Sequence, residues 1–152
     1  MHPKYIFLVG LFILFALLGP AFGDKKSYGD IEGVVYLGNY DGDTVRFNLP
    51  GVHPLIGQNI SVRIRGIDTP EIRGECLAEI KLAKQAKVML GQLLDRAGRI
   101  TLKEVGRGKY FRIVAYVVAD GVDVSYLLNN SGLAVGYDGG VKSGGWCAGY
   151  GR

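Results

Sequence analysis

Two short acidic segments stand next to residues that favour tight turns. Asp41-Gly42-Asp43-Thr44 leads into an alternating stretch of sequence, and Asp68-Thr69-Pro70-Glu71 closes another one. Carboxylate oxygens suit Ca²⁺ or Mg²⁺, whereas zinc and copper favour nitrogen and sulfur ligands. Each segment also has an ordinary interpretation, because Asp-Gly pairs are common in turns and Asp-Thr-Pro-Glu can begin a helix. Neither segment alone decides between a hard-metal site and a turn.

Arginines placed near these carboxylates favour chemistry on phosphate. Arg63 precedes Asp68 by five residues, and Arg112 stands at the start of a later strand-like stretch. Guanidinium groups bind phosphate oxygens in a bidentate manner and neutralise charge that develops in phosphoryl transfer. Metal-binding carboxylates, two arginines and a further carboxylate that orients water suffice for phosphodiester hydrolysis. The residues alone do not choose among the neighbouring basic groups, which include Arg65, Arg107 and Lys109.

Histidine is too scarce to carry the chemistry. The chain contains only His2 and His53, and His53 stands alone in a proline-containing segment. A two-histidine ribonuclease mechanism, a His-x-His metal site and a Ser-His-Asp triad all need more than one isolated histidine. Hydrolysis by this chain would therefore depend on carboxylates, arginines and a hard metal ion.

The elements expected to position these residues are mostly strands. Alternating, β-branched segments predict five strands, at residues 31–37, 44–48, 60–67, 100–105 and 111–119. Apolar residues at helical spacing from Leu82 to Ala97 predict one amphipathic helix of about 20 residues, which stops before Gly98. A second, short helix is expected over residues 124–130, after a cap at Asp123. This order predicts an α+β fold: a five-stranded Greek-key barrel of the OB type, with its long helix after the third strand.

The N-terminus has the pattern of an export signal. Lys4 is followed by an apolar run of about 14 residues and then by the small residues Ala21 and Gly23. This run is shorter than the roughly 20 residues that span a bilayer, which favours a cleaved signal over residues 1–23. The expected folded domain is then 24–152, and the protein would be secreted or periplasmic. The alternative is an uncleaved segment that anchors the domain to the membrane.

Charge and cysteine content restrict the possible partners and bonds. The formal net charge is +4, or about +3 without residues 1–23, and no block of Lys and Arg occurs. A mildly basic domain can bind an anion such as nucleic acid without a polycationic arm. The cysteines are Cys76 and Cys147, which cannot form a structural zinc site by themselves. An oxidising compartment permits a disulfide between them, and two free thiols remain the alternative.

Four motifs in sequence order resemble the staphylococcal nuclease family. They cover residues 41–44, 62–71 and 109–116, and the pair of segments 119–121 and 131–134, so the resemblance extends from about Tyr28 to Tyr137. Any one motif is common, but all four in this order are specific. The resemblance implies an OB-type barrel that acts as a monomer on nucleic acid, without a required protein partner. It also implies Ca²⁺-dependent hydrolysis of DNA or RNA at the P–O5′ bond, leaving 3′-phosphate ends.

The resemblance also implies a function for individual residues. The metal ligands would be the carboxylates of Asp43 and Asp68 and the backbone carbonyl of Thr69. Asp41 would lie behind these ligands without binding the ion itself. Glu71 matches the glutamate usually drawn as the general base. The remaining matches are the phosphate-binding arginines Arg63 and Arg112 and the nucleotide-pocket tyrosines Tyr110 and Tyr137.

Two departures from the family pattern distinguish this chain. Cys76 follows Glu71 at only the fifth position, where the best-known member has a long lysine-rich loop that forms one wall of the substrate groove. The last helix of the family is also missing, since Tyr137 leads into a glycine-rich end with Lys142 and the pair Trp146-Cys147. A short bacterial branch has a similar ending and a cysteine near its helix start, which implies a bridge between Cys76 and Cys147.

A binding module of the same fold is the main alternative to an enzyme. Such a module would bind single-stranded nucleic acid or a protein ligand on the barrel without cleaving it. Members that have lost catalysis usually lack a metal carboxylate or an arginine, and this chain retains all of them. The sequence therefore favours the nuclease.

Overall fold

The computed structural model of the protein describes residues 26–142 and 145–147. The predicted export signal over residues 1–23 and its cleavage site lie outside the described residues. Within the described ranges, no helix is both long enough and apolar enough to cross a membrane.

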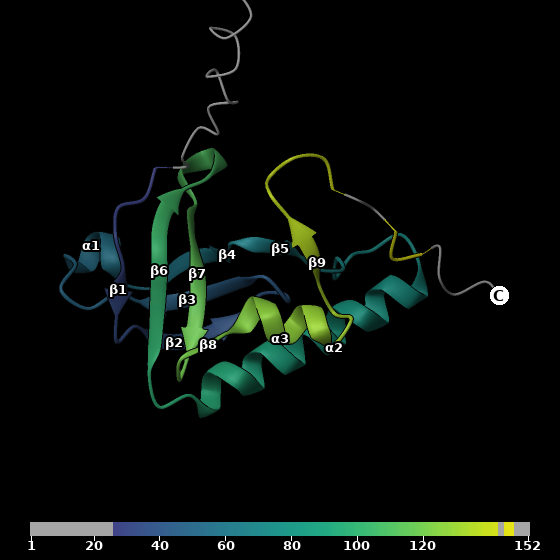
Figure 1. Ribbon diagram of the computed structural model, residues 1–152, viewed down its shortest axis with the longest axis horizontal. Helices are drawn as coiled ribbons and strands as arrows, with labels where there is room; N and C mark the ends of the chain where they lie inside the picture. Colours follow the sequence, from purple (N-terminus) through teal and green to yellow (C-terminus); the bar gives the residue numbers. More distant parts are fainter. Residues whose placement is uncertain (1–25, 143–144, 148–152) are drawn as a thin grey trace, which may run out of the picture.

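A strongly curled sheet forms the body of the molecule (Figure 1). Its β4 and β7 run parallel, and the other neighbouring pairs run antiparallel. The curled sheet with its helices forms an OB-like α+β half-barrel, as predicted. The spatial order of the main strands is β1 (Ile31–Glu32), β6 (Ile100–Arg107), β7 (Ile113–Ala119), β4 (Ile60–Ile64), β3 (Thr44–Asn48) and β2 (Val35–Asn39), and β8 (Val122–Asp123) pairs with β7.

The first predicted strand forms both edges of this sheet. Instead of one strand over residues 31–37, the chain forms β1 and β2, with Gly33 in a left-handed conformation at φ +64° between them. A residue without a Cβ adopts this conformation at little cost, so the chain bends there. β1 then pairs with β6 and β2 pairs with β3, which curls the sheet toward closure.

A second glycine divides the third predicted strand and creates a small separate sheet. Gly66, with φ +85°, ends the pairing of β4 with β7 and begins β5 (Gly66–Asp68). β5 pairs with β9 (Val135–Tyr137), so that Gly66 lies opposite Tyr137 and Asp68 opposite Val135. The sequence did not predict β9, because three residues are too few to show an alternating pattern. This small sheet brings the end of the third predicted strand beside the chain that leads to the C-terminus.

The helices lie largely where the sequence predicts them. α2 (Leu77–Arg96) is the predicted long helix, and α3 (Val124–Asn130) begins at Asp123, whose carboxylate accepts the N–H of Ser125 at 2.8 Å. α1 (Pro54–Gly57) is a short helix in the segment that was expected to be a loop. A single 3₁₀ turn over Lys109–Phe111 precedes β7, where the predicted strand was expected to have begun already.

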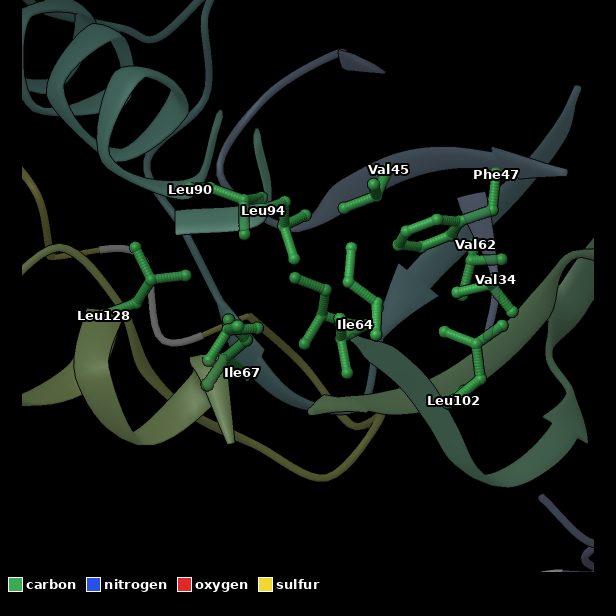
Figure 2. Close-up of a cluster of buried hydrophobic side chains, with 14 of the residues drawn as sticks. Val34, Val45, Phe47, Val62, Ile64, Ile67, Leu90, Leu94, Leu102 and Leu128 are labelled. Carbon is green, nitrogen blue, oxygen red and sulfur yellow. The ribbon is translucent and has the colours of Figure 1, made fainter. Parts of the chain in front are cut away.

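The hydrophobic core lies between the concave face of the curled sheet and the two longer helices. Figure 2 shows Leu90 and Leu94 of α2 pointing toward Ile64 and the strands, and Leu128 of α3 approaching from the other side. These side chains are at most 2% exposed, as are several strand residues, among them Val45, Phe47, Val62 and Leu102. A fully buried side chain of this kind contributes about 1.5 to 3 kcal/mol of transfer free energy, so the core holds α2 against the sheet.

Candidate active site

The turn between β2 and β3 fixes Asp43 immediately before β3. Asp41 Oδ1 accepts the backbone N–H groups of Asp43 at 3.0 Å and Thr44 at 2.7 Å, which closes the turn. Gly42 packs directly against α2, since a Cβ at this position would lie 2.7 Å from the Cβ of Ala86. Asp41 thus supports Asp43 through the backbone, and the turn cannot accept a larger residue at position 42 without moving the helix.

Asp43 is a buried carboxylate with several hydrogen-bond donors around it. It is 2% exposed, and its Oδ2 accepts both the backbone N–H and the hydroxyl of Thr69 at 3.2 Å. Its Oδ1 accepts the hydroxyl of Thr44 at 3.1 Å and pairs with Arg63. Burial nevertheless raises the pKa of Asp43 to about 6, because desolvation and the neighbouring charges of Asp41 and Asp68 outweigh the lowering by Arg63 and Thr44.

Arg63 joins the two predicted metal-binding carboxylates. Its Nη1 pairs with Asp43, and its Nη2 lies 2.8 Å from Oδ1 of Asp68, which is itself only 3% exposed at the end of β5. The guanidinium carbon also lies 5.8 Å from the ring centroid of Tyr137 on β9. Arg65, the neighbour that the sequence could not separate from Arg63, instead donates to the backbone carbonyl of Glu104 at 2.9 Å.

Glu71 lies on the surface next to this pair, and a buried glutamate holds its backbone. The N–H of Glu71 donates to Oε1 of Glu79 at 3.2 Å, and the carbonyl of Glu71 accepts the N–H of Gly74 at 2.9 Å. Oε2 of Glu79 accepts the N–H of Glu75 at 2.9 Å. Gly74 covers this carboxylate closely, since a Cβ there would lie 2.5 Å from Cδ of Glu79. The short loop between Glu71 and Cys76 is therefore wrapped around the Glu79 side chain.

Lys142 reaches the same carboxylates from the C-terminal segment. Its Nζ lies 3.1 Å from Oδ1 of Asp68 and forms a hydrogen bond to Oε1 of Glu71. Burial alone would lower the pKa of Lys142, but the hydrogen bonds to Glu71 and Asp68 outweigh burial and raise the pKa. Sequence reasoning did not place Lys142 in the site, because no local pattern links residues 71 positions apart.

A disulfide attaches this C-terminal segment to the start of α2. Cys76 and Cys147 are bonded, with their Cα atoms 6.0 Å apart, which confirms the predicted bridge. Cys76 is also the N-cap of α2, and its sulfur accepts the N–H of Glu79 at 3.4 Å. This is one half of a capping box, since the Glu79 carboxylate accepts the N–H groups of Glu71 and Glu75 and not that of the cap residue, so no local motif identifies Glu79 beforehand. Both sulfurs lie beside Glu79, but this trio is no thiolate metal site because the sulfurs are bonded to each other.

A basic pocket of about 500 Å³ opens on the other side of Arg63. Six Lys or Arg residues and one acidic residue, Asp138, belong to its lining. Arg112 stands at the exposed rim, after a turn closed by the Gly108 N–H and the Arg112 carbonyl at 2.8 Å. The lining includes Arg63, Arg65, Arg107, Lys109, Arg112 and Tyr137.

The predicted site residues divide between the pocket and the carboxylate cluster. Arg63, Arg112 and Tyr137 line the pocket, whereas Asp43, Asp68 and Glu71 are not in the lining and adjoin it through Arg63. Tyr110 is the predicted residue that the structure does not bring to either group. Its side chain is 97% exposed on the 3₁₀ turn and does not line the pocket.

The charge of the carboxylate cluster fits a hard divalent cation. The cluster contains four carboxylates, those of Asp41, Asp43, Asp68 and Glu71. In the described structure Arg63 and Lys142 offset only two of them, which leaves two negative charges in excess. The metal-ligating atoms that Asp43 and Asp68 offer are carboxylate oxygens, and oxygen ligands suit Ca²⁺ or Mg²⁺. Asp43, Asp68 and Thr69 are accordingly the residues that could hold such an ion.

Comparison with known proteins gives the same family as the motifs. The sequence profile described as staphylococcal nuclease homologue matches residues 61–143, more than half of the chain. An uncharacterized protein of Bacillus anthracis is 31% identical over 97 residues, which cover 62% of this chain and 42% of the relative. The chain thus spans less than half the length of that relative. Because the profile covers β4 to β9 and both Arg63 and Arg112, the resemblance read from the motifs is confirmed: the chain belongs to the staphylococcal nuclease homologue family.

Proposed function

We propose that the chain is an exported, Ca²⁺-dependent nuclease that hydrolyses phosphodiester bonds of DNA, RNA or both. Cleavage would occur at the P–O5′ bond and leave 3′-phosphate ends, as in the family it belongs to. The observation that carries the proposal is the position of Arg63. This one side chain lines the basic pocket and also bonds the two buried aspartates, so a phosphate bound in the pocket would lie next to the carboxylate cluster.

The pocket supplies the binding of the substrate backbone. Guanidinium groups hold phosphate oxygens in a bidentate geometry, and Arg63 and Arg112 come from neighbouring segments, β4 and the residue that precedes β7. Tyr137 contributes an aromatic ring beside Arg63, suited to contact with a sugar or base. Lys109 and Arg107 extend the positive surface away from the carboxylates.

The carboxylate cluster supplies metal binding and proton transfer. Asp43, Asp68 and Thr69 would hold Ca²⁺, which when bound polarises a phosphoryl oxygen of the substrate. Glu71 is the exposed carboxylate next to Asp68 and is suited to take a proton from the attacking water. The water oxygen then bonds to phosphorus, the P–O5′ bond breaks, and the departing oxygen takes a proton from solvent. Arg63 and Arg112 neutralise the negative charge that develops on the phosphate.

Degradation of single-stranded DNA in the presence of Ca²⁺ tests this function. We expect activity with Ca²⁺ and none in EGTA. Glu71→Gln removes the proton acceptor and should lower kcat by about 10² to 10⁴. Arg112→Ala removes one guanidinium group from the pocket that would bind phosphate and should lower kcat/KM by about 10² to 10³.

Charge-matched variants separate these effects from general loss of charge. Glu75→Gln alters an exposed glutamate of the same loop, and Arg96→Ala alters an exposed arginine at the end of α2. Both should retain nearly full activity. Full activity in EGTA would contradict Ca²⁺ dependence. Binding of single-stranded DNA without cleavage under any divalent metal would favour the non-catalytic OB-type module.

Export is a separate part of the proposal and has its own test. Residues 1–23 combine a basic start, an apolar run and small residues, as cleaved secretory signals do. We expect the protein recovered outside the cytoplasm to begin at Asp24. A full-length chain retained in the membrane fraction would instead indicate an N-terminal anchor.

A further inference from the structure

The segment after β9 returns to the active-site carboxylates and carries its own positive charge. It leaves β9 through a tight turn in which the hydroxyl of Tyr137 donates to the carbonyl of Gly140 at 2.8 Å. Two residues later, the ammonium group of Lys142 contacts Asp68 and Glu71. An ammonium group therefore lies on the same carboxylates to which a divalent metal would be attracted.

This segment is anchored on both sides of Lys142. On one side, β9 pairs with β5 along its whole length, so Tyr137 is fixed opposite Gly66. On the other side, Cys147 is bonded to Cys76 at the start of α2, a few residues beyond Glu71. In Figure 1 the yellow C-terminal stretch accordingly lies next to the first turn of α2. Anchoring at both ends raises the effective concentration of the ammonium group at the carboxylates.

Lys142 is the cation of this site that can leave. Arg63 also contacts Asp68, but its side chain is 12% exposed, and it stands on β4, whose backbone pairs with strands on both sides. The side chain of Lys142 is 46% exposed and stands on a loop. An ammonium group that keeps contact with water can be displaced from a carboxylate at modest cost. A divalent ion that approaches Asp68 would therefore displace Lys142 and leave Arg63 in place.

We propose that Lys142 is a built-in competitor of the divalent metal for Asp68 and Glu71, and that the Cys76–Cys147 disulfide makes this competition intramolecular. The inference rests on the proposed metal-dependent function. While the ammonium group occupies the carboxylates, metal binding must first displace it, so the apparent affinity for metal is lowered in proportion. Opening the disulfide frees one end of the segment and weakens the competition. The redox state of the bridge thus sets the metal affinity of the site.

Calorimetric titration with Ca²⁺ alone, without substrate, tests the competition directly. In the oxidised protein, Lys142→Met removes the ammonium group and keeps most of the side-chain volume. We expect this variant to bind Ca²⁺ about five- to tenfold more tightly, the size of effect given by one partly exposed ion pair. Lys142→Arg retains the charge and should stay near the wild-type affinity. Lys84→Met removes an exposed lysine on α2 and controls for the change in net charge.

Reduction of the disulfide gives the second arm of the experiment. A dithiol transfers two electrons and two protons to the bridge, leaving two thiols and the oxidised reagent. The reduced wild type should gain most of the affinity that Lys142→Met gains, and reduction of Lys142→Met should add little more. Circular dichroism and a thermal melt confirm that the reduced proteins remain folded. If reduction unfolds them, the Ca²⁺ affinities of the oxidised Lys142→Met and Lys142→Arg variants still test the competition.

The possible outcomes distinguish this inference from the proposed function. Wild-type protein that binds Ca²⁺ with the same affinity as Lys142→Met, or more tightly, would overturn the competition while leaving the nuclease untouched. An equal gain in Lys84→Met would attribute the effect to net charge and would also overturn it. Wild-type protein that binds no divalent metal and degrades no nucleic acid would overturn the proposed function, and the competition with it.

Discussion

At the scale of single residues, Asp43 is held in an unfavourable state. Its carboxylate accepts hydrogen bonds from Thr44 and Thr69 and pairs with Arg63, yet its pKa is raised to about 6 by burial and by two neighbouring carboxylates. Without a metal, the ionised form of this side chain therefore destabilises the folded protein near neutral pH. A residue that costs stability in this way is suited to a function that needs its charge.

The substitution Asp43→Asn tests this cost in the metal-free protein. The folded-state pKa of about 6 lies above the ordinary value of 3.8, so the folded protein binds more protons than the unfolded chain between these pH values. The wild-type free energy of unfolding should then fall as the pH rises through this window. The asparagine variant should lack that loss and be about 1 to 3 kcal/mol more stable than wild type at pH 7.5.

Urea unfolding in EGTA at pH 4.5 and pH 7.5 measures the difference. The same variant should bind Ca²⁺ much more weakly, because a metal ligand has lost its charge. Thr101→Ser, at a half-buried position of β6, serves as a control that alters no charge near the site. A variant that is less stable than wild type at pH 7.5 would show that Arg63 stabilises ionised Asp43 more than burial destabilises it.

The residues of the site were predictable from sequence to the extent that they stand in short ordered motifs. Asp43 and Arg63 meet because β3 and β4 are neighbours, and Asp68 lies on β5, which follows β4 directly along the chain. The turn residues beside these strands are local signals, so the sequence predicts them. Arg112 joins Arg63 at the pocket because β7 pairs with β4, whereas Tyr137 reaches it on β9, a strand that the sequence did not predict. Lys142 was not predictable, because its contact depends on the path of a glycine-rich segment. The exposed position of Tyr110 follows from a left-handed backbone, with φ 57°, that the sequence pattern does not reveal.

At the scale of secondary-structure elements, α2 positions the loop after Glu71 as well as covering the core. Its first turn provides Glu79, a buried carboxylate that accepts the N–H groups of Glu71 and Glu75. The best-known member of the family has a long loop after the matching glutamate, whereas here a short loop is wrapped around the Glu79 side chain. The backbone of Glu71 is therefore fixed from the helix, and Glu79 is a positioning residue for it.

The substitution Glu79→Gln should separate positioning from binding. Gln offers one acceptor oxygen where Glu offers two, so one of the two backbone N–H groups would face an amide NH₂ group instead. We expect kcat to fall about tenfold or more through misplacement of Glu71, while KM and the Ca²⁺ affinity change less than about twofold. Glu75→Gln, with the same chemical change on the exposed neighbour, should leave kcat unaltered. Unchanged kcat in Glu79→Gln, or parallel loss of Ca²⁺ binding, would argue against a positioning role.

The elements themselves were largely predictable, but their breaks were not. Alternation identified every segment that enters the curled sheet except the two-residue β8, and helical periodicity identified α2 and α3. Alternation continues through Gly33 and Gly66, so each predicted strand covered two observed ones. Only the tertiary pairing shows that β5 leaves the large sheet to meet β9. That departure matters to function, because it places Asp68 beside the C-terminal segment.

At the scale of the whole molecule, positive and negative charge are separated on the two sides of Arg63. The pocket collects basic side chains from β4, β6 and the turn before β7, whereas the carboxylates come from the β2–β3 turn, β5 and the loop before α2. The C-terminal segment closes the acidic side and is attached by the disulfide. The bridge therefore links this segment to the start of α2.

The disulfide is expected to stabilise the fold as a whole. The bonded cysteines close a loop of 71 residues, for which the chain-entropy model gives roughly 4 kcal/mol. The segment from β9 to Cys147 also gains freedom in the folded protein when it is released, which reduces the loss. We therefore expect the double variant Cys76→Ser/Cys147→Ser to be about 2 to 4 kcal/mol less stable in urea unfolding at pH 7.5.

Serine is the appropriate replacement because it preserves the helix cap. Cys76 is the N-cap of α2, and a serine hydroxyl can accept the N–H of Glu79 as the sulfur does. Reduced wild type should show a similar loss, which links the effect to the bond and not to the new side chains. Comparison with Cys147→Ser alone, which leaves Cys76 in place, checks that the cap is intact. A loss below about 1 kcal/mol would mean that β9 pairing alone holds the C-terminal segment, and that Lys142 reaches the carboxylates without the bridge.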